Sequence, residues 1–418
     1  KVTGAALSFE SDTGVGAAVG LNVGMVTNEA IIGSDIVVDA GNISIQAVTP
    51  EEKTNDFTVW ALAIGGGKDN GVAGSAGINV MAMDTDAGTG TGTTLKSTGN
   101  IDIDAENDLS YQNIAGGGGV GKKAGVGVAV AANIITMNTD AYIGDGTHAD
   151  ASEIISIDSD SSITPVNLEI PGMVNLGFGV SSIAAGGGVS TSSEGKAAVG
   201  GSAVIDVHVQ NTHAYIGEGT QINTDNTIIP GTDQSVVINA SSLTRILNGA
   251  GGLAVAFGGT GVGIGLDVGV IVKDTSAYIE SGSTVTADKS VTVTADSEED
   301  ITSVAVSAGV SKENGIAGSL AVFVLTADTR AAIEGASVDS GGDVILTATD
   351  TSSLNTIAFT VAAAGKTGVG AAGSVNVITN NVLAEVSGSA VDSGGDVSIT
   401  ATSTPIIRSL GIGVSGSG

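Results

Sequence analysis

The sequence has no cysteine and few prolines, aromatic residues or basic residues, and each shortage narrows the possible classes of protein. Among 418 residues there are 5 prolines, 3 histidines and no cysteine. Disulfide bonds therefore do not hold the fold together. Only 14 basic side chains oppose 44 acidic ones, which gives a formal charge of −30. This charge disfavours a nucleic-acid partner, because the phosphate backbone requires basic contacts.

Glycine, by contrast, is abundant at 65 residues. It does not recur at every third position, which excludes a collagen-like triple helix. Long helices are disfavoured as well, since each interior glycine costs about 1 kcal/mol relative to alanine. Short runs of Val, Ile, Thr, Ala and Ser alternate at period two, which is typical of β-strands. The composition predicts an all-β protein.

One long hydrophobic run, Leu253–Val272, has the length of a membrane-spanning helix and a single charge, Asp267. It contains six glycines and aligns with charged segments of other repeats, where Lys68 or Glu313 occupies the middle. We therefore expect strands here and no membrane span.

Internal repetition is the main feature of the sequence. Residues 301–405 contain nearly the same passage twice, and the offset from Gly315 to Gly368 and from Asp343 to Asp396 is 53 residues. Repeats of this length indicate a stacked architecture. The sequence predicts a β-solenoid in which each unit has a hairpin or a tight double turn, formed by either one large coil or two smaller ones.

A glycine after a polar turn identifies the units. It recurs at Gly14, Gly71, Gly125, Gly261, Gly315 and Gly368, with Ala198 once in its place. The spacings are 57, 54, 73, 63, 54 and 53 residues. Since Asn70-Gly71 favours positive φ, a β-hairpin or a sharp solenoid corner is expected at this position of each unit.

We predict about seven units in one continuous array, without separate domains. Their approximate spans are 1–56, 57–110, 111–175, 176–248, 249–300, 301–353 and 354–405, followed by a partial unit at 406–418. Both ends lie at a similar phase of the repeat, so we expect the chain to be a segment of a longer array or a mature product. The third and fourth units carry extra residues, at Ser161–Asn175 and Thr224–Gln234, which are expected to project as loops.

Alternation within the strands separates two faces. Val304, Val306 and Val310 lie on one face of the predicted strand, and Ala305 and other small residues lie on the opposite face. We expect the aliphatic face to form the core and the small-residue face to lie outside, where a neighbouring solenoid could pack flat against it. The alternative is that the small residues line a narrow interior.

Candidate site residues are few. Tyr142, Tyr215 and Tyr278 share one repeat position, and we expect a packed aromatic ladder there. Asp339, Asp343, Asp392 and Asp396 are weak calcium candidates, but no calcium-binding loop motif is present, so turn roles are favoured. The histidines His148, His208 and His213 lack the spacing of metal ligands. No catalytic residue, metal site or cofactor is therefore predicted.

The segments DAYIGDGT from Asp140, HAYIGEGT from His213 and VDSGGDVSITATS from Val391 resemble a known family. The repeats are similar to those of large bacterial filamentous-haemagglutinin-like and leukotoxin-type surface adhesins. The resemblance implies a secreted, extended β-solenoid on the cell surface, without catalytic residues.

We therefore expect a structural protein, an extracellular fibre or adhesin stalk that associates with copies of itself. A module that binds surface glycans or cell receptors through the inserted loops is the alternative. A polysaccharide-cleaving enzyme and an ice-binding solenoid are weaker alternatives; the latter follows from Thr-x-Thr pairs such as Thr347 and Thr349.

Overall fold

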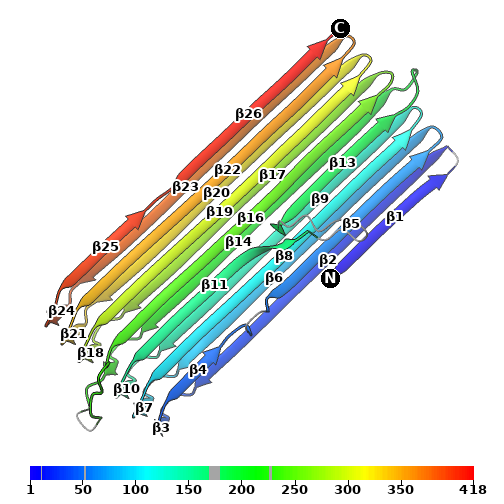
Figure 1. Cartoon of the computed structure of the whole chain (residues 1–418). Coiled ribbons are helices and arrows are strands. Elements are labelled where there is room, and N and C mark those ends of the chain that lie inside the picture. The colour runs from blue at the N-terminus through cyan, green and yellow to red at the C-terminus, as the bar shows by residue number, and fades with distance from the viewer. Residues whose placement is uncertain (11, 51–52, 169–178, 226–227) are drawn as a thin grey trace.

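The computed structural model describes the whole chain except residues 11, 51–52, 169–178 and 226–227. The described residues form strands and short corners, without a helix among them. In Figure 1 the long strands lie side by side from β1 at one end to β26 at the other, so the chain advances by stacking. The prediction of an all-β solenoid is confirmed at this level.

Three sheets enclose the interior, and we call them A, B and C. Sheet A contains β1 (Val2–Glu10), β4 (Ile43–Ala47), β5 (Asn55–Gly67), β8 (Ile101–Gly121), β11 (Ile155–Asn167), β12 (Gly179–Val180), β13 (Ser182–Ser190), β16 (Val236–Ala256), β19 (Val291–Ser311), β22 (Val344–Ala364), β25 (Val397–Ser403) and β26 (Ile406–Ser417). Sheet B contains β2 (Thr13–Ile32), β6 (Asn70–Thr89), β9 (Ala124–Ile143), β14 (Ala197–Ile216), β17 (Thr260–Ile279), β20 (Asn314–Glu334) and β23 (Thr367–Ser387). Sheet C contains β3 (Val37–Ala40), β7 (Thr94–Ser97), β10 (His148–Ala151), β15 (Gln221–Ile222), β18 (Thr284–Ala287), β21 (Ser337–Ser340) and β24 (Ala390–Ser393).

One repeat of the sequence makes one coil. Residues 291–340, for example, supply β19 to sheet A, β20 to sheet B and β21 to sheet C, and β22 then begins the next coil. Neighbouring coils pair in parallel, and in sheet B their register joins Gly315 to Gly368 and Gly71 to Gly125. Ala198 pairs with Gly125 on one side and Gly261 on the other.

The polar turn before each of these glycines is a solenoid corner. The turn at Lys122 and Lys123 joins β8 to β9, which belong to different sheets and do not pair with each other. The expectation of positive φ at Gly71 is wrong, because positive φ occurs instead at the corner between sheets B and C. The residues with positive φ at that corner are Asp35, Gly92, Gly146, Gly219, Gly282, Gly335 and Gly388.

Near sheet C the coil is broad and encloses an aliphatic core. This core includes Ile157, Ile238, Val293 and Leu346, whose side chains are fully buried. We call this part, residues 291–302 and 323–340 and the equivalent positions of other coils, the broad half. Its outward positions are mostly polar or acidic, as alternation predicts for a half-buried sheet.

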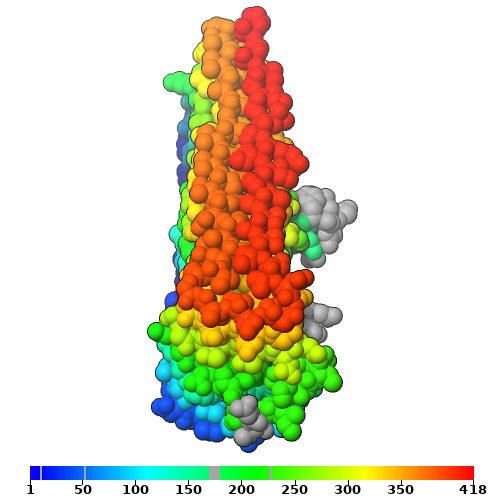
Figure 2. All heavy atoms as spheres, turned by 90° about the vertical axis from the view of Figure 1, so that its left-hand side faces the viewer, coloured from blue at the N-terminus to red at the C-terminus, as the bar shows by residue number. Residues whose placement is uncertain are grey.

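Towards the corner between sheets A and B the molecule narrows, as Figure 2 shows. We call this part, residues 303–322 and their equivalents, the narrow half. Its sheets approach so closely that a Cβ on Gly71 would lie 2.1 Å from the carbonyl oxygen of Val120. Only small residues fit between them, and Ala305 and Ala321 are fully buried.

The expected orientation of the strands in the narrow half is therefore wrong. The small residues face the interior, and the aliphatic residues face outward, with Val306 exposed to 38%, Leu320 to 40% and Ile264 to 50%. The alternative of a narrow interior is the correct one. The physical reason is the short distance between the two sheets, which leaves no room for branched side chains on both inner faces.

The long hydrophobic run is also explained by this arrangement. Residues Leu253–Val272 are divided between β16 and β17, which meet at a corner. Within the described ranges, the chain contains no helix with the length and apolarity needed to cross a membrane.

Candidate functional site

The three repeated tyrosines form a ladder on the outer face of sheet B. The rings of Tyr142 and Tyr215 are 5.3 Å apart, and those of Tyr215 and Tyr278 are 5.0 Å apart and nearly parallel. The guanidinium of Arg330 lies 5.9 Å from the Tyr278 ring and extends the stack by a cation–π contact. In-register pairing of β9, β14 and β17 places these side chains one above the other.

Charged side chains border the ladder. His213 Nδ1 lies 2.9 Å from a carboxylate oxygen of Asp140, and its Nε2 lies 3.7 Å from Asp274. Burial alone would lower the pKa of His213, but these two carboxylates raise it to about 9, so the ring is cationic at neutral pH. His213, Tyr278 and Arg330 line a surface depression of about 520 Å³.

A buried polar ladder runs along the solenoid axis between the broad and narrow halves. Asn22 Nδ2 donates to Asn79 Oδ1 at 3.1 Å, and Asn79 Nδ2 donates to Asn133 Oδ1 at 3.0 Å. Asn133 then donates to the carboxylate of Asp206 in the next coil. These bonds satisfy interior amides that would otherwise be costly to bury.

The ladder ends in two buried carboxylates. Asn248 donates to Asp206 and, at 3.5 Å, to Asp267, which also accepts from Ser303. Burial raises the pKa of Asp206 to about 6. Burial and the nearby charge of Asp206 raise the pKa of Asp267 to about 8, so Asp267 is protonated at neutral pH. Asp267 is the single charged residue that interrupts the long hydrophobic run of the sequence.

A second polar cluster lies inside the broad half. Lys273 Nζ contacts Glu299 Oε1 at 2.7 Å, and neither side chain is exposed. Ser297 donates to Glu299 at 2.7 Å, and Ser352 donates to it at 2.8 Å. Burial lowers the pKa of Lys273, while Glu299 opposes this shift. The pair is fully buried and hydrogen-bonded, which is the arrangement that a buried ion pair requires.

The four aspartates considered for calcium are exposed and lie at corners or on sheet C. Asp339 pairs with Asp392 between β21 and β24. Asp343 Oδ1 accepts the backbone N–H of Asp396 at 2.8 Å, so its carboxylate caps the next coil. Asn42 accepts the N–H of Asn100 in the same way, also at 2.8 Å. The described residues contain no group of three or more acidic or histidine side chains able to hold a metal ion.

The remaining histidines differ in environment. His148 is exposed on β10, whereas His208 is fully buried, with Nε2 at 3.4 Å from the hydroxyl of Tyr111. Burial lowers the pKa of His208 to about 3, which keeps the ring neutral. The three histidines do not come together.

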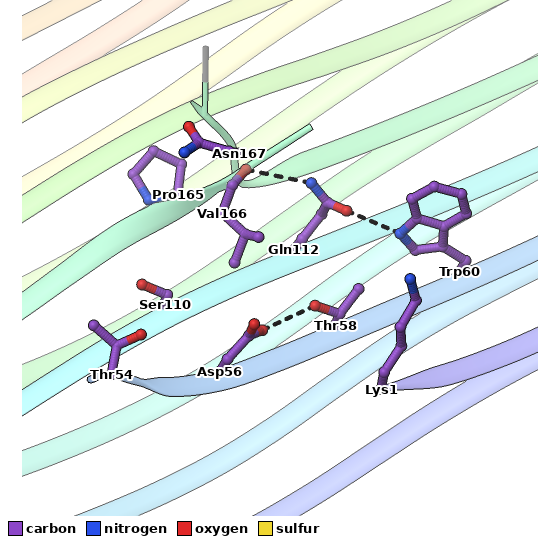
Figure 3. Close-up of a pocket in the computed structure, with 10 residues that line it drawn as sticks. All are labelled: Lys1, Thr54, Asp56, Thr58, Trp60, Ser110, Gln112, Pro165, Val166 and Asn167. Atoms are coloured by element: carbon purple, nitrogen blue, oxygen red, sulfur yellow. Dashed lines mark hydrogen bonds between the residues drawn. The ribbon is translucent and has the colours of Figure 1, made fainter. Parts of the chain in front are cut away.

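A pocket of about 500 Å³ on the outside of sheet A was missed by the sequence argument (Figure 3). Trp60 Nε1 donates to Gln112 Oε1 at 2.8 Å, and Gln112 Nε2 donates to the carbonyl of Val166 at 3.3 Å. Lys1 Nζ lies 4.8 Å from the centre of the Trp60 ring. The available signal was that Trp60 is the only tryptophan in the chain.

The pocket includes the start of the first insertion through Pro165, Val166 and Asn167. Residues 169–175 of that insertion lie outside the described residues. The second insertion borders a different depression, formed with Asp150 and Thr286, that shares no residue with the first. The described parts of the two insertions therefore do not form one site.

The architecture is that of a parallel β-solenoid with three faces, a broad aliphatic half and a narrow glycine-rich half. No family model, no curated protein and no solved structure matches the chain.

Proposed function

We propose that the chain is part of an extracellular fibre or adhesive stalk on a bacterial surface, which grows by end-to-end stacking of coils. The observation that carries this proposal is the in-register parallel stacking of equivalent coils, to which a further coil of the same kind can add. Along the solenoid axis, sheet A begins at β1 and ends at β25 and β26. Sheet B begins at β2 and ends at β23, and sheet C begins at β3 and ends at β24. Each terminal strand has one unpaired edge, which is a template for another strand.

The last coil also exposes side chains that belong to the core. Val397 and Ile399 are 51% and 48% exposed, whereas their register partners Val344 and Leu346 are fully buried. A further coil stacked on this end would bury them. The seven strands of sheet B support a count of seven units in the array. The likeness of the repeats to filamentous surface adhesins supports the assignment to a cell surface.

Electron microscopy of the purified chain over a range of concentrations tests end-to-end growth. We expect filaments whose length increases with concentration and whose axis runs across the strands. The variant Val397→Lys/Ile399→Lys places two charges on the open core and should abolish elongation.

The matched control is Ser398→Lys/Thr400→Lys, which adds the same charges to the same strand at positions that face outward. It should still elongate. Single particles of the unchanged chain at every concentration would contradict the proposal, as would equal filament lengths for the two variants.

The Trp60 pocket favours a second candidate function, the binding of a surface carbohydrate. An aromatic ring beside amide, hydroxyl and carboxylate groups suits a sugar, which stacks one face on the ring and hydrogen-bonds at its edge. Thr58, Gln112 and Asp56 supply those polar groups. Glycan-array binding that is lost in Trp60→Ala and retained after deletion of 224–234 would support this function; no binding by the unchanged chain would exclude it.

A further inference from the structure

The outer side of sheet B carries a continuous apolar surface over the narrow half and the two adjoining outward positions of the broad half. It comprises six outward positions on each of seven strands, which in β2 run from Val15 to Met25. In β17 these positions are Val262, Ile264, Leu266, Val268, Val270 and Val272. All are apolar except Thr136, Thr326 and Thr379, and none is charged. We call this surface the apolar face.

The apolar side chains cannot turn inward. On the inner side of the neighbouring sheet, a Cβ on Gly252 would lie 2.0 Å from the carbonyl oxygen of Ile264. The two backbones are therefore nearly in contact beneath the apolar face. Its side chains can leave water only by contact with another molecule.

The size of the apolar face matches that of a stable protein interface. Each outward residue covers about 30 Å², from a strand spacing of about 4.8 Å and two residues of rise, so the face measures about 1,300 Å². A standard interface requires about 800 Å² on each partner. The face is also regular, with Val15, Val72, Val126, Val199 and Val262 in one row along the axis. A second copy presents the same rows at the same spacing.

Charges at the two borders of the apolar face determine how two copies can align. The corner at one border carries a net positive charge, because its six lysines outnumber its four acidic residues, and among its described residues only Lys123 and Lys366 form ion pairs, with Asp69 and Glu313. The six lysines are Lys68, Lys122, Lys123, Lys196, Lys312 and Lys366, and the four acidic residues are Asp12, Asp69, Glu194 and Glu313. The first polar row at the other border holds Asp84, Asp274 and Asp328. With facing strands antiparallel, the lysine corner of each copy lies over the aspartate row of the other. Parallel strands would instead oppose like charges, which is unfavourable.

We propose that two copies of this chain associate side by side through the apolar faces of sheet B, with their facing strands antiparallel. This contact does not depend on end-to-end stacking, because it uses a different surface. A lipid bilayer fits the same face less well. Insertion would take the charged corner and the unpaired edges of β2 and β23 into hydrocarbon, where unsatisfied backbone groups are costly.

The test measures the mass of the chain in solution, in the Val397→Lys/Ile399→Lys background that blocks end-to-end growth. We expect twice the single-chain mass of 40.4 kDa. Adding Ile205→Lys and Ile264→Lys, which alter side chains that are 40% and 50% exposed, should give the single-chain mass without changing the circular dichroism spectrum. The matched control, Leu253→Lys/Val306→Lys, changes similarly exposed residues on sheet A and should leave the pair intact.

Cysteine cross-linking tests the orientation, since the chain has no cysteine of its own. Ala124 and Asn138 lie at the two borders of the apolar face on β9 and are 14 residues apart, about 46 Å along the strand. They cannot cross-link within one copy. The double variant Ala124→Cys/Asn138→Cys should form linked pairs with a short thiol-reactive linker, and either single variant should not.

Three results would overturn the inference. A single-chain mass for the background variant at all concentrations up to the solubility limit would exclude the pair. If the background variant is a single chain that floats with phosphatidylcholine vesicles, and adding Ile205→Lys and Ile264→Lys abolishes flotation, the apolar face binds lipid instead of a second copy. Efficient linking of a single cysteine variant to itself would exclude the antiparallel orientation.

Discussion

The two halves of each coil use opposite arrangements of the same strand pattern. In the broad half Leu346 and Val293 point inward, and carboxylates such as Asp296 point outward. In the narrow half Ala305 and Ser307 point inward, and Val304 and Val306 point outward. One strand, β19, contains both arrangements. Distance between the sheets, rather than hydrophobicity alone, therefore decides which side chains are buried.

The halves should also differ in how they contribute to stability. The broad half gains free energy from aliphatic burial. The narrow half gains little from its interior, which consists of backbone and small side chains, and depends on coil-to-coil hydrogen bonds and on contacts of its outer face. Four predictions test this difference, in order of decreasing effect.

The buried ion pair of the broad half should give the largest change. Glu299→Gln removes the carboxylate that contacts buried Lys273 directly, and we expect a loss of about 3–5 kcal/mol in the free energy of unfolding. The double variant Lys273→Met/Glu299→Leu removes both charges and should be much closer to the unchanged protein. Urea denaturation of both variants measures the difference. Equal losses would show that the pair itself, rather than an unpaired charge, is responsible.

Truncation of aliphatic side chains should separate the two halves. Leu346→Ala removes a fully buried side chain and should cost about 2–5 kcal/mol. Val306→Ala removes one that is 38% exposed and should change the free energy of unfolding by about 0.5 kcal/mol or less. The comparison fails if the second substitution costs as much as the first in the single-chain state.

Two adjacent glycines of β16 should respond differently to alanine. Gly252→Ala puts a Cβ 2.0 Å from the backbone of β17 and should cost about 1–3 kcal/mol. Gly251→Ala adds a methyl group on the outer side, where no atom lies within 4 Å, and should be neutral or slightly stabilising. Thermal unfolding of the two variants measures this difference in stability. A similar loss for both would mean that the sheets are farther apart than the structure shows.

The polar ladder should make stability depend on pH. The pKa of Asp267 is raised from its ordinary 3.8 to about 8, so the folded state holds its proton more tightly than the unfolded state. This contribution is complete below pH 4 and is lost as the pH rises towards 8, at up to about 1.4 kcal/mol per pH unit. Asp267→Asn should remove this part of the pH dependence and stabilise the fold at pH 8 by about 1–2 kcal/mol. If Asp267→Asn leaves the slope of the free energy of unfolding against pH unchanged, Asp267 is not protonated in the folded state at neutral pH.

The sequence predicted the fold class because the relevant information is local and repeated. Alternation predicted strands, and the 53-residue offset between Gly315 and Gly368 predicted stacking. The same alternation does not say which face is inside. Val306 and Leu346 follow the same period-two pattern, and only the distance to the facing sheet distinguishes them.

The interior polar groups could not be found in the same way. Asp206 and Asp267 are 61 residues apart in the sequence, and the hydrogen bonds that join them run through Asn248 of another sheet. The Trp60 pocket likewise combines residues of four coils. Contacts across sheets depend on how the coils lie over one another, and a repeat spacing does not contain that information.

Cysteine labelling in solution tests the inverted arrangement of the narrow half most directly. Val306→Cys and Ser307→Cys place single thiols on neighbouring residues of β19, in a chain that has no other cysteine. We predict fast reaction of the thiol at position 306 with a maleimide reagent under native conditions, and protection at position 307 until the protein is unfolded. Protection at 306 with fast reaction at 307 would contradict the account, because it would place the aliphatic side chains inside.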